Sequence, residues 1–271
     1  MTHPNAGSTL AVTVGLLALT ALAPSAASAA GPDWTCRASA AYLEAEPLLG
    51  DVRVEPISAN GIASVANPDR ARCSTQDAGI PDITLPPGPL APPGQIAVRA
   101  AFAKTKITPE TGPRSTQSIS AQGGVTRSVD INLGPNVIRV EADLVESAAE
   151  GACVAGSPVL AGTSRVVGLR INGNSIDVPD DGSEPTVLNL LPLVRIALND
   201  QDRSGTATSS TQSLTRRALD IQVLGLLGRP TIHAVVGESV VGRSGAVCED
   251  TGGATGPTGP GGATGSTGST G

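Results

Sequence analysis

The sequence predicts an all-β fold, an antiparallel β-sandwich-like domain built from repeated hairpins and followed by a disordered Gly/Thr-rich C-terminal tail. Three observations support this prediction. The chain is rich in Gly (33) and Pro (22), which favour turns, and Val, Ile, Thr and Ser dominate between them, which favours strands. Apolar and polar residues alternate with a period of two around short glycine turns. Aromatic residues make up only 1% of the chain, so the core has to be aliphatic.

The first segment is predicted to be a signal peptide. Residues 10–23 are almost purely apolar, a length typical of a signal-peptide core and too short to span a bilayer. The small residues at 27–29 match the pattern of signal peptidase sites, so residues 1–29 should be removed. No Lys or Arg precedes the apolar run, which is unusual for an export signal. No later stretch approaches the roughly 20 apolar residues of a membrane span, so we expect a secreted protein, or one held at the cell surface without a transmembrane helix.

Residues 30–250 are predicted to form one disulfide-bonded β domain with three related hairpins. Each hairpin has an alternating apolar segment, a Gly-centred turn and a second alternating segment, and a cysteine follows. The strand pairs are 41–45 with 52–55, 129–133 with 137–142, and 219–223 with 231–235, which lead to Cys73, Cys153 and Cys248. Such alternation around a short turn is typical of an antiparallel hairpin with one buried face.

A fourth hairpin and two connectors complete the predicted domain. The strands of this hairpin, 166–171 and 175–178, flank an Asn-Gly step that tolerates the positive φ of a tight turn. Another strand is expected at 193–198, followed by a polar loop at 199–213. The segment 85–94 is too rich in proline for a strand or a helix, so we expect an extended crossover on the surface of one sandwich.

The four cysteines are predicted to form the disulfides Cys36–Cys73 and Cys153–Cys248. An even number of cysteines in an exported protein implies bridges, and four cysteines allow three pairings. The favoured pairing bridges the first hairpin unit to itself and joins the equivalent ends of the other two. On the chain-entropy model each bridge contributes about 4 kcal/mol. Zinc and a catalytic thiol are disfavoured, because no CxxC-type spacing occurs and the processed chain offers only His233 as a base.

The tail at 251–271 has a collagen-like pattern, with Gly at every third position from Gly253 to Gly271. A triple helix requires this spacing because only Gly fits at its axis. Six triplets with few prolines are too short to hold three chains together unaided. A flexible spacer is therefore the preferred interpretation, and a trimer is expected only if the repeat is longer than shown.

The chain has one weak candidate for a metal site. Asp200, Asp202 and Ser204 follow the opening of a calcium loop, in which alternate oxygens converge on one ion. Thr211 stands at the twelfth position, where a bidentate carboxylate is needed, so a polar loop without metal is preferred. A second acidic segment has even less pattern and contains Asp177, Asp180, Asp181 and Glu184. We therefore predict no cofactor.

No catalytic residue and no nucleic-acid partner are predicted. His233 alternates with apolar neighbours, so it should lie on the polar face of a strand or accept one hydrogen bond. The pair Arg216-Arg217 is interpreted as the solvated approach to a strand. No Gly-x-Ser-x-Gly elbow supports a serine nucleophile. The net charge of −6 comes from scattered residues without a basic stripe or stacking aromatics, which argues against nucleic-acid binding.

The sequence from Val166 onward resembles the choice-of-anchor P family of actinobacterial surface proteins. The matching stretches are VVGLRINGNSIDV at 166–178, LND at 198–200, and ALDIQVLGLLG with TIHAVVGESVVG within 218–242. The proline-glycine run near Leu85 is similar too. This resemblance implies a secreted, β-rich surface protein of no assigned activity, and it supplies no catalytic residues. The tail shows neither an LPxTG-type sorting motif nor a hydrophobic helix with a basic end, so the mode of attachment stays open.

These features predict a secreted or cell-surface structural or adhesive protein of the bacterial envelope, without catalytic activity. A secreted module that binds a glycan or small ligand is the alternative, although sugars usually stack on aromatic rings that this chain lacks. A secreted hydrolase ranks last, because no base is placed for it.

Overall fold

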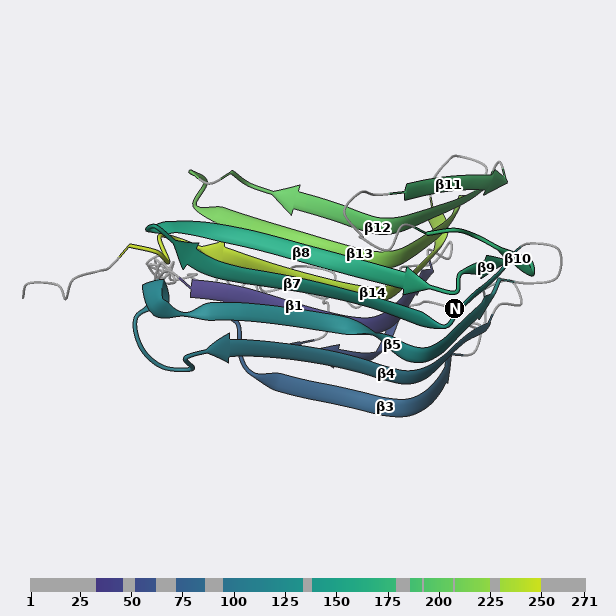
Figure 1. Ribbon diagram of the computed structural model, residues 1–271, viewed down its shortest axis with the longest axis horizontal. Coiled ribbons are helices and arrows are strands. Elements are labelled where there is room, and N and C mark those ends of the chain that lie inside the picture. Colours follow the sequence, from purple (N-terminus) through teal and green to yellow (C-terminus); the bar gives the residue numbers. More distant parts are fainter. Residues whose placement is uncertain are drawn as a thin grey trace, which may run out of the picture. The chain divides into compact units, whose positions relative to one another are not determined.

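The computed structural model describes residues 33–45, 52–61, 72–85, 95–133, 138–178, 186–191, 193–206, 208–224 and 230–249. All of them belong to the unit Gly31–Gly271. The predicted signal peptide and the predicted tail lie outside the described residues. The described part forms two antiparallel sheets, A and B, that pack against each other (Figure 1). The predicted all-β sandwich is therefore confirmed.

Sheet A has six strands in the order β11-β12-β13-β14-β1-β2. Their bounds are Asp33–Ala45 (β1), Val52–Ala59 (β2), Thr186–Leu191 (β11), Val194–Ser204 (β12), Thr211–Leu224 (β13) and Pro230–Ser244 (β14). The first and last strands pair along their whole length, from Asp33 opposite Ser244 to Ala45 opposite Ile232. The two ends of the described chain are thus neighbours at the centre of one sheet.

Sheet B has eight strands. Their bounds are Gln76–Leu85 (β3), Gln95–Thr108 (β4), Ser118–Asn132 (β5), Arg139–Ala142 (β6), Leu144–Val154 (β7), Ser157–Val167 (β8), Arg170–Ile171 (β9) and Asn174–Ser175 (β10). Strand β5 pairs with β4 on one side and with β6 and β7 in succession on the other. A short 3-10 helix, η2 (Arg114–Thr116), lies between β4 and β5.

The predicted hairpins are confirmed, although the fourth is shorter than expected. The pairs β1–β2, β5–β6 and β13–β14 correspond to the three related hairpins. In the fourth, Asn172 and Gly173 adopt φ values of 50° and 81°, as a tight hairpin turn requires. Only β9 and β10, each two residues long, pair across this turn. The preceding strand is interrupted at Gly168, where φ is 68°.

Two connectors differ from the prediction. Leu85 pairs with Ile96, so segment 86–94, itself outside the described residues, joins neighbouring strands of sheet B and is not a crossover. The predicted polar loop at 199–213 is mostly strand, because β12 continues to Ser204 and β13 begins at Thr211. Residues 201–204 are exposed, so their polarity reflects a strand that extends beyond the core, not a loop.

The hydrophobic core between the sheets is mainly aliphatic, and Trp34 is its aromatic member among the described residues. This tryptophan is fully buried, and its indole Nε1 donates a hydrogen bond to the carbonyl oxygen of Arg114 at 3.0 Å. The sheets approach closely at Gly123 of β5, where a Cβ atom would overlap the carbonyl oxygens of Ser39 and Glu238 in sheet A. Only glycine fits at this point. The largest fully buried aliphatic side chains are Ile96, Ile119, Ile131, Leu169, Ile196, Leu198, Leu214, Leu219 and Ile221.

The cysteines are joined in the pairing that the sequence favoured. The Cα atoms of Cys36 and Cys73 are 4.7 Å apart, and those of Cys153 and Cys248 are 5.5 Å apart. Cys36 lies in β1 of sheet A and Cys73 precedes β3 of sheet B. Cys153 lies in β7 of sheet B and Cys248 follows β14 of sheet A. The Cys153–Cys248 disulfide therefore joins a strand of sheet B to the segment that follows the last strand of sheet A. The Cys36–Cys73 disulfide joins β1 to the segment that leads into β3, and the N–H of Cys73 also donates to the carbonyl oxygen of Trp34 in β1.

Candidate functional site

The outer face of sheet A carries a cluster of charged side chains, which we call the ion-pair network. Its centre is Glu238 of β14, whose side chain is 4% exposed. One carboxylate oxygen of Glu238 accepts a hydrogen bond from Arg37 Nη1. The other accepts hydrogen bonds from Tyr42 Oη at 3.0 Å and Arg217 Nε at 2.8 Å. The members of the network come from β1, β2, β13 and β14 and are Arg37, Tyr42, Glu44, Arg53, Glu55, Arg217, Asp220, His233 and Glu238.

A change of face along β13 assembles this network. Leu214 before Ala218 and both Leu219 and Ile221 after it belong to the core, so the inward positions shift from even to odd numbers. In β14 the residue opposite Ala218 is Gly237, which has a φ of 70°. On an uninterrupted strand, side chains three positions apart would point to opposite faces. Because of the shift, Arg217 and Asp220 share the outer face.

Glu238 is held as a carboxylate. Burial by itself would raise its pKa, but the charges and hydrogen bonds of Arg37 and Arg217 outweigh burial and lower the pKa to about 2. A buried carboxylate with two arginine partners and a tyrosine donor has its charge and its lone pairs satisfied. It is not available to accept a proton at neutral pH.

His233 is held as a cation. Its Nδ1 lies 3.0 Å from Glu44 Oε2 of β1, and its Nε2 lies 3.0 Å from Asp220 Oδ1 of β13. Burial would lower the pKa of His233, but the hydrogen bonds and charges of Asp220 and Glu44 outweigh it and raise the pKa to about 9. The sequence predicted that His233 lies on the polar face of a strand or accepts one hydrogen bond. The structure instead clamps both ring nitrogens between carboxylates.

Two residues of β2, Arg53 and Glu55, also belong to the ion-pair network. Arg37 also contacts Glu55 through Nη2, and the side chains of both residues are almost fully buried. Arg53 forms an ion pair with Glu44, and its guanidinium carbon lies 3.8 Å from the centre of the Tyr42 ring. Such a stacked cation adds to the attraction of the ion pair. The network therefore ties four strands of sheet A together.

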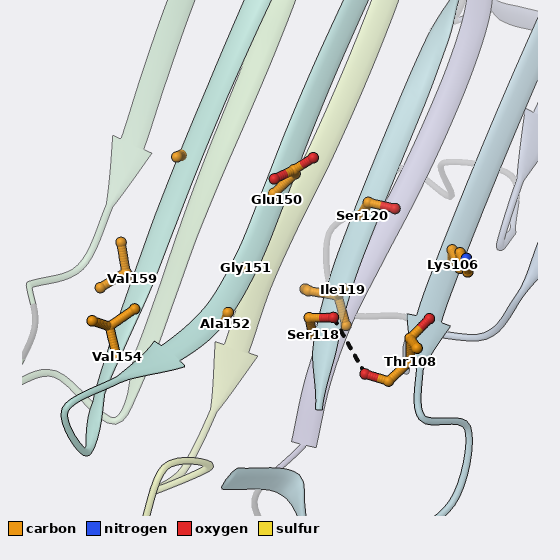
Figure 2. A pocket seen from close by; sticks show the side chains of 11 residues that line it. Lys106, Thr108, Ser118, Ile119, Ser120, Glu150, Gly151, Ala152, Val154 and Val159 are labelled. Carbon is orange, nitrogen blue, oxygen red and sulfur yellow. Dashed lines mark hydrogen bonds between the residues drawn. The ribbon is translucent and has the colours of Figure 1, made fainter. Parts of the chain in front are cut away.

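The outer face of sheet B has a different character. One depression on this face, which we call the hollow, has a volume of about 460 Å³ (Figure 2). Figure 2 shows Lys106 and Thr108 on β4, Ser118 and Ser120 on β5, and Glu150 on β7 around it. Ser118 Oγ donates a hydrogen bond to the carbonyl oxygen of Thr108 at 3.2 Å. The rest of the lining is apolar and consists of Ile119, Gly151, Ala152, Val154, Val159 and Ala161.

The two charged side chains of the hollow, Lys106 and Glu150, form no ion pair with each other or with any other described residue. Both side chains are exposed. A second depression of about 360 Å³ lies on the same four strands and includes Phe102, Gln122 and Arg165. Together the two depressions are lined by hydroxyl, amide, ammonium, guanidinium and carboxylate groups.

The predicted calcium residues do not form a loop. Asp200, Asp202 and Ser204 lie in β12 and pair with Arg217, Thr215 and Ser213 of β13. Asp200 also forms an ion pair with Arg217 at 3.4 Å. Of the second acidic segment, only Asp177 lies within the described residues. No group of three or more His, Cys, Asp or Glu side chains in that part of the chain is arranged to hold a metal ion.

The pair Arg216-Arg217 was misjudged as solvated. Arg216 is 2% exposed and lies between the sheets, where its Nη1 donates to Gln201 Oε1 at 3.1 Å. Burial and the nearby charge of Arg203 lower the pKa of Arg216. The sequence also missed Arg37 and Glu238. In the sequence, each of these two charged residues is flanked by small or apolar residues within its strand. This pattern is typical of a strand that is buried on both faces.

Comparisons with family models, with curated proteins and with solved structures gave no match to this chain. Within the described residues, no helix is long and apolar enough to cross a membrane. The case for a function therefore rests on the geometry of the two faces.

Proposed function

We propose that this chain is a secreted or cell-surface structural or adhesive protein of the bacterial envelope, without catalytic activity. The observation that carries the proposal is the use of His233. Both of its ring nitrogens bind carboxylates from flanking strands at 3.0 Å, so the imidazole joins three strands of sheet A. A general base at neutral pH needs a free nitrogen lone pair and a pKa near 7. His233 meets neither requirement.

The disulfides support the extracellular part of the proposal. The four cysteines form two disulfides, and such bonds persist in oxidising compartments and are rare in the cytosol. The apolar run at 10–23 and the small residues at 27–29 supply a route of export. The resemblance of 166–242 to choice-of-anchor P surface proteins agrees with a location at the envelope.

A secreted ligand-binding module is the second candidate, and the hollow on sheet B favours it. Its hydroxyl groups and its oppositely charged Lys106 and Glu150 suit a ligand with many hydrogen-bonding groups, such as a glycan or an extended peptide. The same face would also suit an adhesive protein, because a broad sheet surface has room for an extended polymer. The two candidates differ in whether a small fragment of the polymer binds by itself.

The location is tested by separating the producing cells into cytosol, envelope and medium. We expect the protein in the envelope or the medium, with peptide mapping under non-reducing conditions recovering the linked peptides of Cys36–Cys73 and Cys153–Cys248. Protein recovered from the cytosol with four free thiols would contradict the proposal.

The contact face is tested by sedimentation of the purified protein with isolated envelopes. We expect Lys106→Gln to weaken co-sedimentation several-fold. The matched control is Lys104→Gln, because Lys104 lies two residues away on β4 and pairs with Asp77 at 3.2 Å, outside the hollow. Competition by short envelope fragments would favour the ligand-binding module, and equal loss of binding in both variants would argue against the hollow.

A further inference from the structure

The hollow and the second depression on sheet B are parts of one surface feature, which we call the trough. Their linings meet at successive outward positions of the same strands, Ser120 and Gln122 on β5, and Glu150 and Ala148 on β7. The register places Ser120 opposite Glu150 (Figure 2) and Gln122 opposite Ala148. The two pairs are therefore neighbouring rows of one sheet surface, and a ligand in one depression continues into the other.

Phe102 lies at one end of the trough, and its side chain is partly exposed. It is the only phenylalanine of the chain, and phenylalanine is among the residue types most often buried. Its register neighbours are Gly79 on β3 and Gly124 on β5, so neither residue directly opposite has a side chain that could cover the ring. Thr108 lines the other end of the trough on the same strand, about 20 Å away at about 3.3 Å per residue.

The charged side chains in the lining of the trough balance each other. Two are cations, Lys106 and Arg165, and two are anions, Glu146 and Glu150. Glu146 and Arg165 also lie opposite each other in the register of β7 and β8. A surface without net charge does not attract a strongly charged polymer. The other polar groups are hydroxyls and the amide of Gln122, which suit a neutral ligand with many hydrogen-bonding groups.

The backbone of the central strands is already used within sheet B. Strand β4 pairs with β3 and β5, β5 pairs with β4 and β7, and β7 pairs with β5 and β8. A peptide that binds by strand addition needs an open sheet edge, whereas the trough lies across these paired strands. Binding in the trough therefore depends on side chains. A sugar ring matches them, because its hydroxyls form hydrogen bonds and its C–H groups pack on an aromatic ring.

We propose that the trough binds a neutral, extended glycan, with one sugar ring packed on Phe102 and the following sugars hydrogen-bonded by side chains of the hollow. This inference rests on the proposed function, because it names the ligand class of the face that we assign to contact with the envelope. A β-linked glycan is the expected form, since the trough follows the strands for about 20 Å and such a chain is extended. Phe102 determines specificity for a sugar over other hydroxyl-rich ligands.

The test is calorimetric titration of the full chain with cellohexaose and chitohexaose, two neutral β-linked hexasaccharides. We expect at least one of them to bind. Phe102→Leu keeps an apolar side chain but removes the ring, so it should weaken binding about tenfold, whereas Phe102→Trp should retain binding. Val187→Ala is the matched control, because Val187 is 43% exposed on β11 of the other sheet, and it should leave the affinity unchanged. Circular dichroism first verifies that each variant is folded.

Several results would overturn the inference. They are the absence of binding of both hexasaccharides at millimolar concentration, equal affinity of Phe102→Leu and the parent protein, and an equal loss in Val187→Ala. Co-sedimentation with envelopes separates this inference from the proposed function. If intact envelopes bind the protein and protease-treated envelopes do not, the partner is a protein, so the glycan is excluded while the adhesive role stands. If neither envelopes nor hexasaccharides bind, both proposals are wrong.

Discussion

The outer faces of the two sheets use their charged residues in opposite ways. On sheet A, the ion-pair network places Glu238 between Arg37 and Arg217 and clamps His233 between Glu44 and Asp220. On sheet B, Lys106 and Glu150 line an open hollow without forming ion pairs among the described residues. The same residue types thus hold strands together in the network of sheet A, whereas at the hollow of sheet B they form no ion pair among the described residues, although ion pairs such as Lys104–Asp77 occur elsewhere on sheet B.

This difference shows why a perturbed histidine and a buried carboxylate do not by themselves indicate an active site. Strongly shifted pKa values occur at catalytic centres and also in structural ion pairs. Here the two shifts favour the charged forms that the ion pairs require, the carboxylate of Glu238 and the imidazolium of His233. We therefore interpret sheet A as the braced layer and sheet B as the contact layer.

The largest expected effect comes from removing a link between the layers. Replacing Cys153 and Cys248 together by Ala should lower the free energy of unfolding by about 4 kcal/mol, because the reduced chain gains conformational freedom when unfolded. Chemical denaturation measures this change. If the double variant keeps the stability of the parent protein, the fold does not depend on this disulfide, and the account of two sheets fastened together by it is contradicted.

The next effect concerns the centre of the network. Glu238→Gln removes the carboxylate charge that lies between Arg37 and Arg217. Arg37 then keeps only Glu55, and Arg217 only Asp200, as an ion-pair partner among the described residues. Breaking a buried pair in this way costs about 3 kcal/mol or more. Urea denaturation at pH 7 measures the loss. A loss below about 0.5 kcal/mol, the range of ordinary surface substitutions, would mean that the network does not brace sheet A.

The spacing of the two layers is tested at Gly123. A Cβ atom at this position would overlap backbone oxygens of Ser39 and Glu238, which side-chain movement cannot relieve, so Gly123→Ala should destabilise the fold by about 1–3 kcal/mol. Gly79→Ala is the matched control, because its Cβ would meet only Ala101 O at an ordinary 3.5 Å. Equal thermal stability of the two variants would contradict the close contact between the sheets.

The pH dependence of stability follows from His233. Because its folded pKa of about 9 lies above the unfolded value of 6.5, its contribution is fully present below pH 6.5 and is lost as pH rises through 9. We expect a decline of roughly 1–2 kcal/mol over this window, a discounted value for a partly exposed group. In His233→Gln the decline should be absent. An unaltered alkaline decline in that variant would assign it to other groups.

Glu238 contributes to the dependence of stability on pH in the acidic range. Its folded pKa of about 2 lies below its usual value of 4.5, so its contribution is present above pH 4.5 and is lost as pH falls toward 2. In the Glu238→Gln variant this part of the acid dependence should be missing.

The smallest expected effect on stability is on sheet B. Glu150→Gln and Lys106→Gln change exposed side chains without ion pairs among the described residues, so each should alter the free energy of unfolding by less than about 0.5 kcal/mol. The same denaturation measurement as for Glu238→Gln provides the comparison. A loss as large as that of Glu238→Gln would remove the distinction between a braced face and a free one.

The sequence predicted the fold class and the hairpins because alternation with a period of two is a local signal. The segments around the Asn172-Gly173 turn and the three Gly-centred turns carried it clearly. The sequence did not predict the extent of β12, because residues 201–204 are exposed on a strand that leaves the core. It also misplaced segment 85–94, because its proline content shows that it is extended and not which strands it joins.

The ion-pair network could not be predicted, because its members meet only through the topology. Arg37 and Glu238 are separated by 201 residues and become neighbours because β1 pairs with β14. The change of face at Ala218 is equally invisible in a count of alternating residues, yet it places Asp220 beside His233. The hollow could not be predicted either, because it is lined by residues from four strands. Alternation along one strand shows which side chains face outward but not whether the sheet surface forms a depression there.

The most direct test of the braced face is the titration of the His233 ring, followed by NMR of the imidazole resonances from pH 5 to pH 10. The chain has only two histidines, so the resonances are readily assigned with the His233→Gln variant. We predict a pKa of about 9, with the ring positively charged at neutral pH. A pKa at or below the ordinary value of about 6.5 would contradict the clamp by Glu44 and Asp220, and with it the structural role assigned to the network.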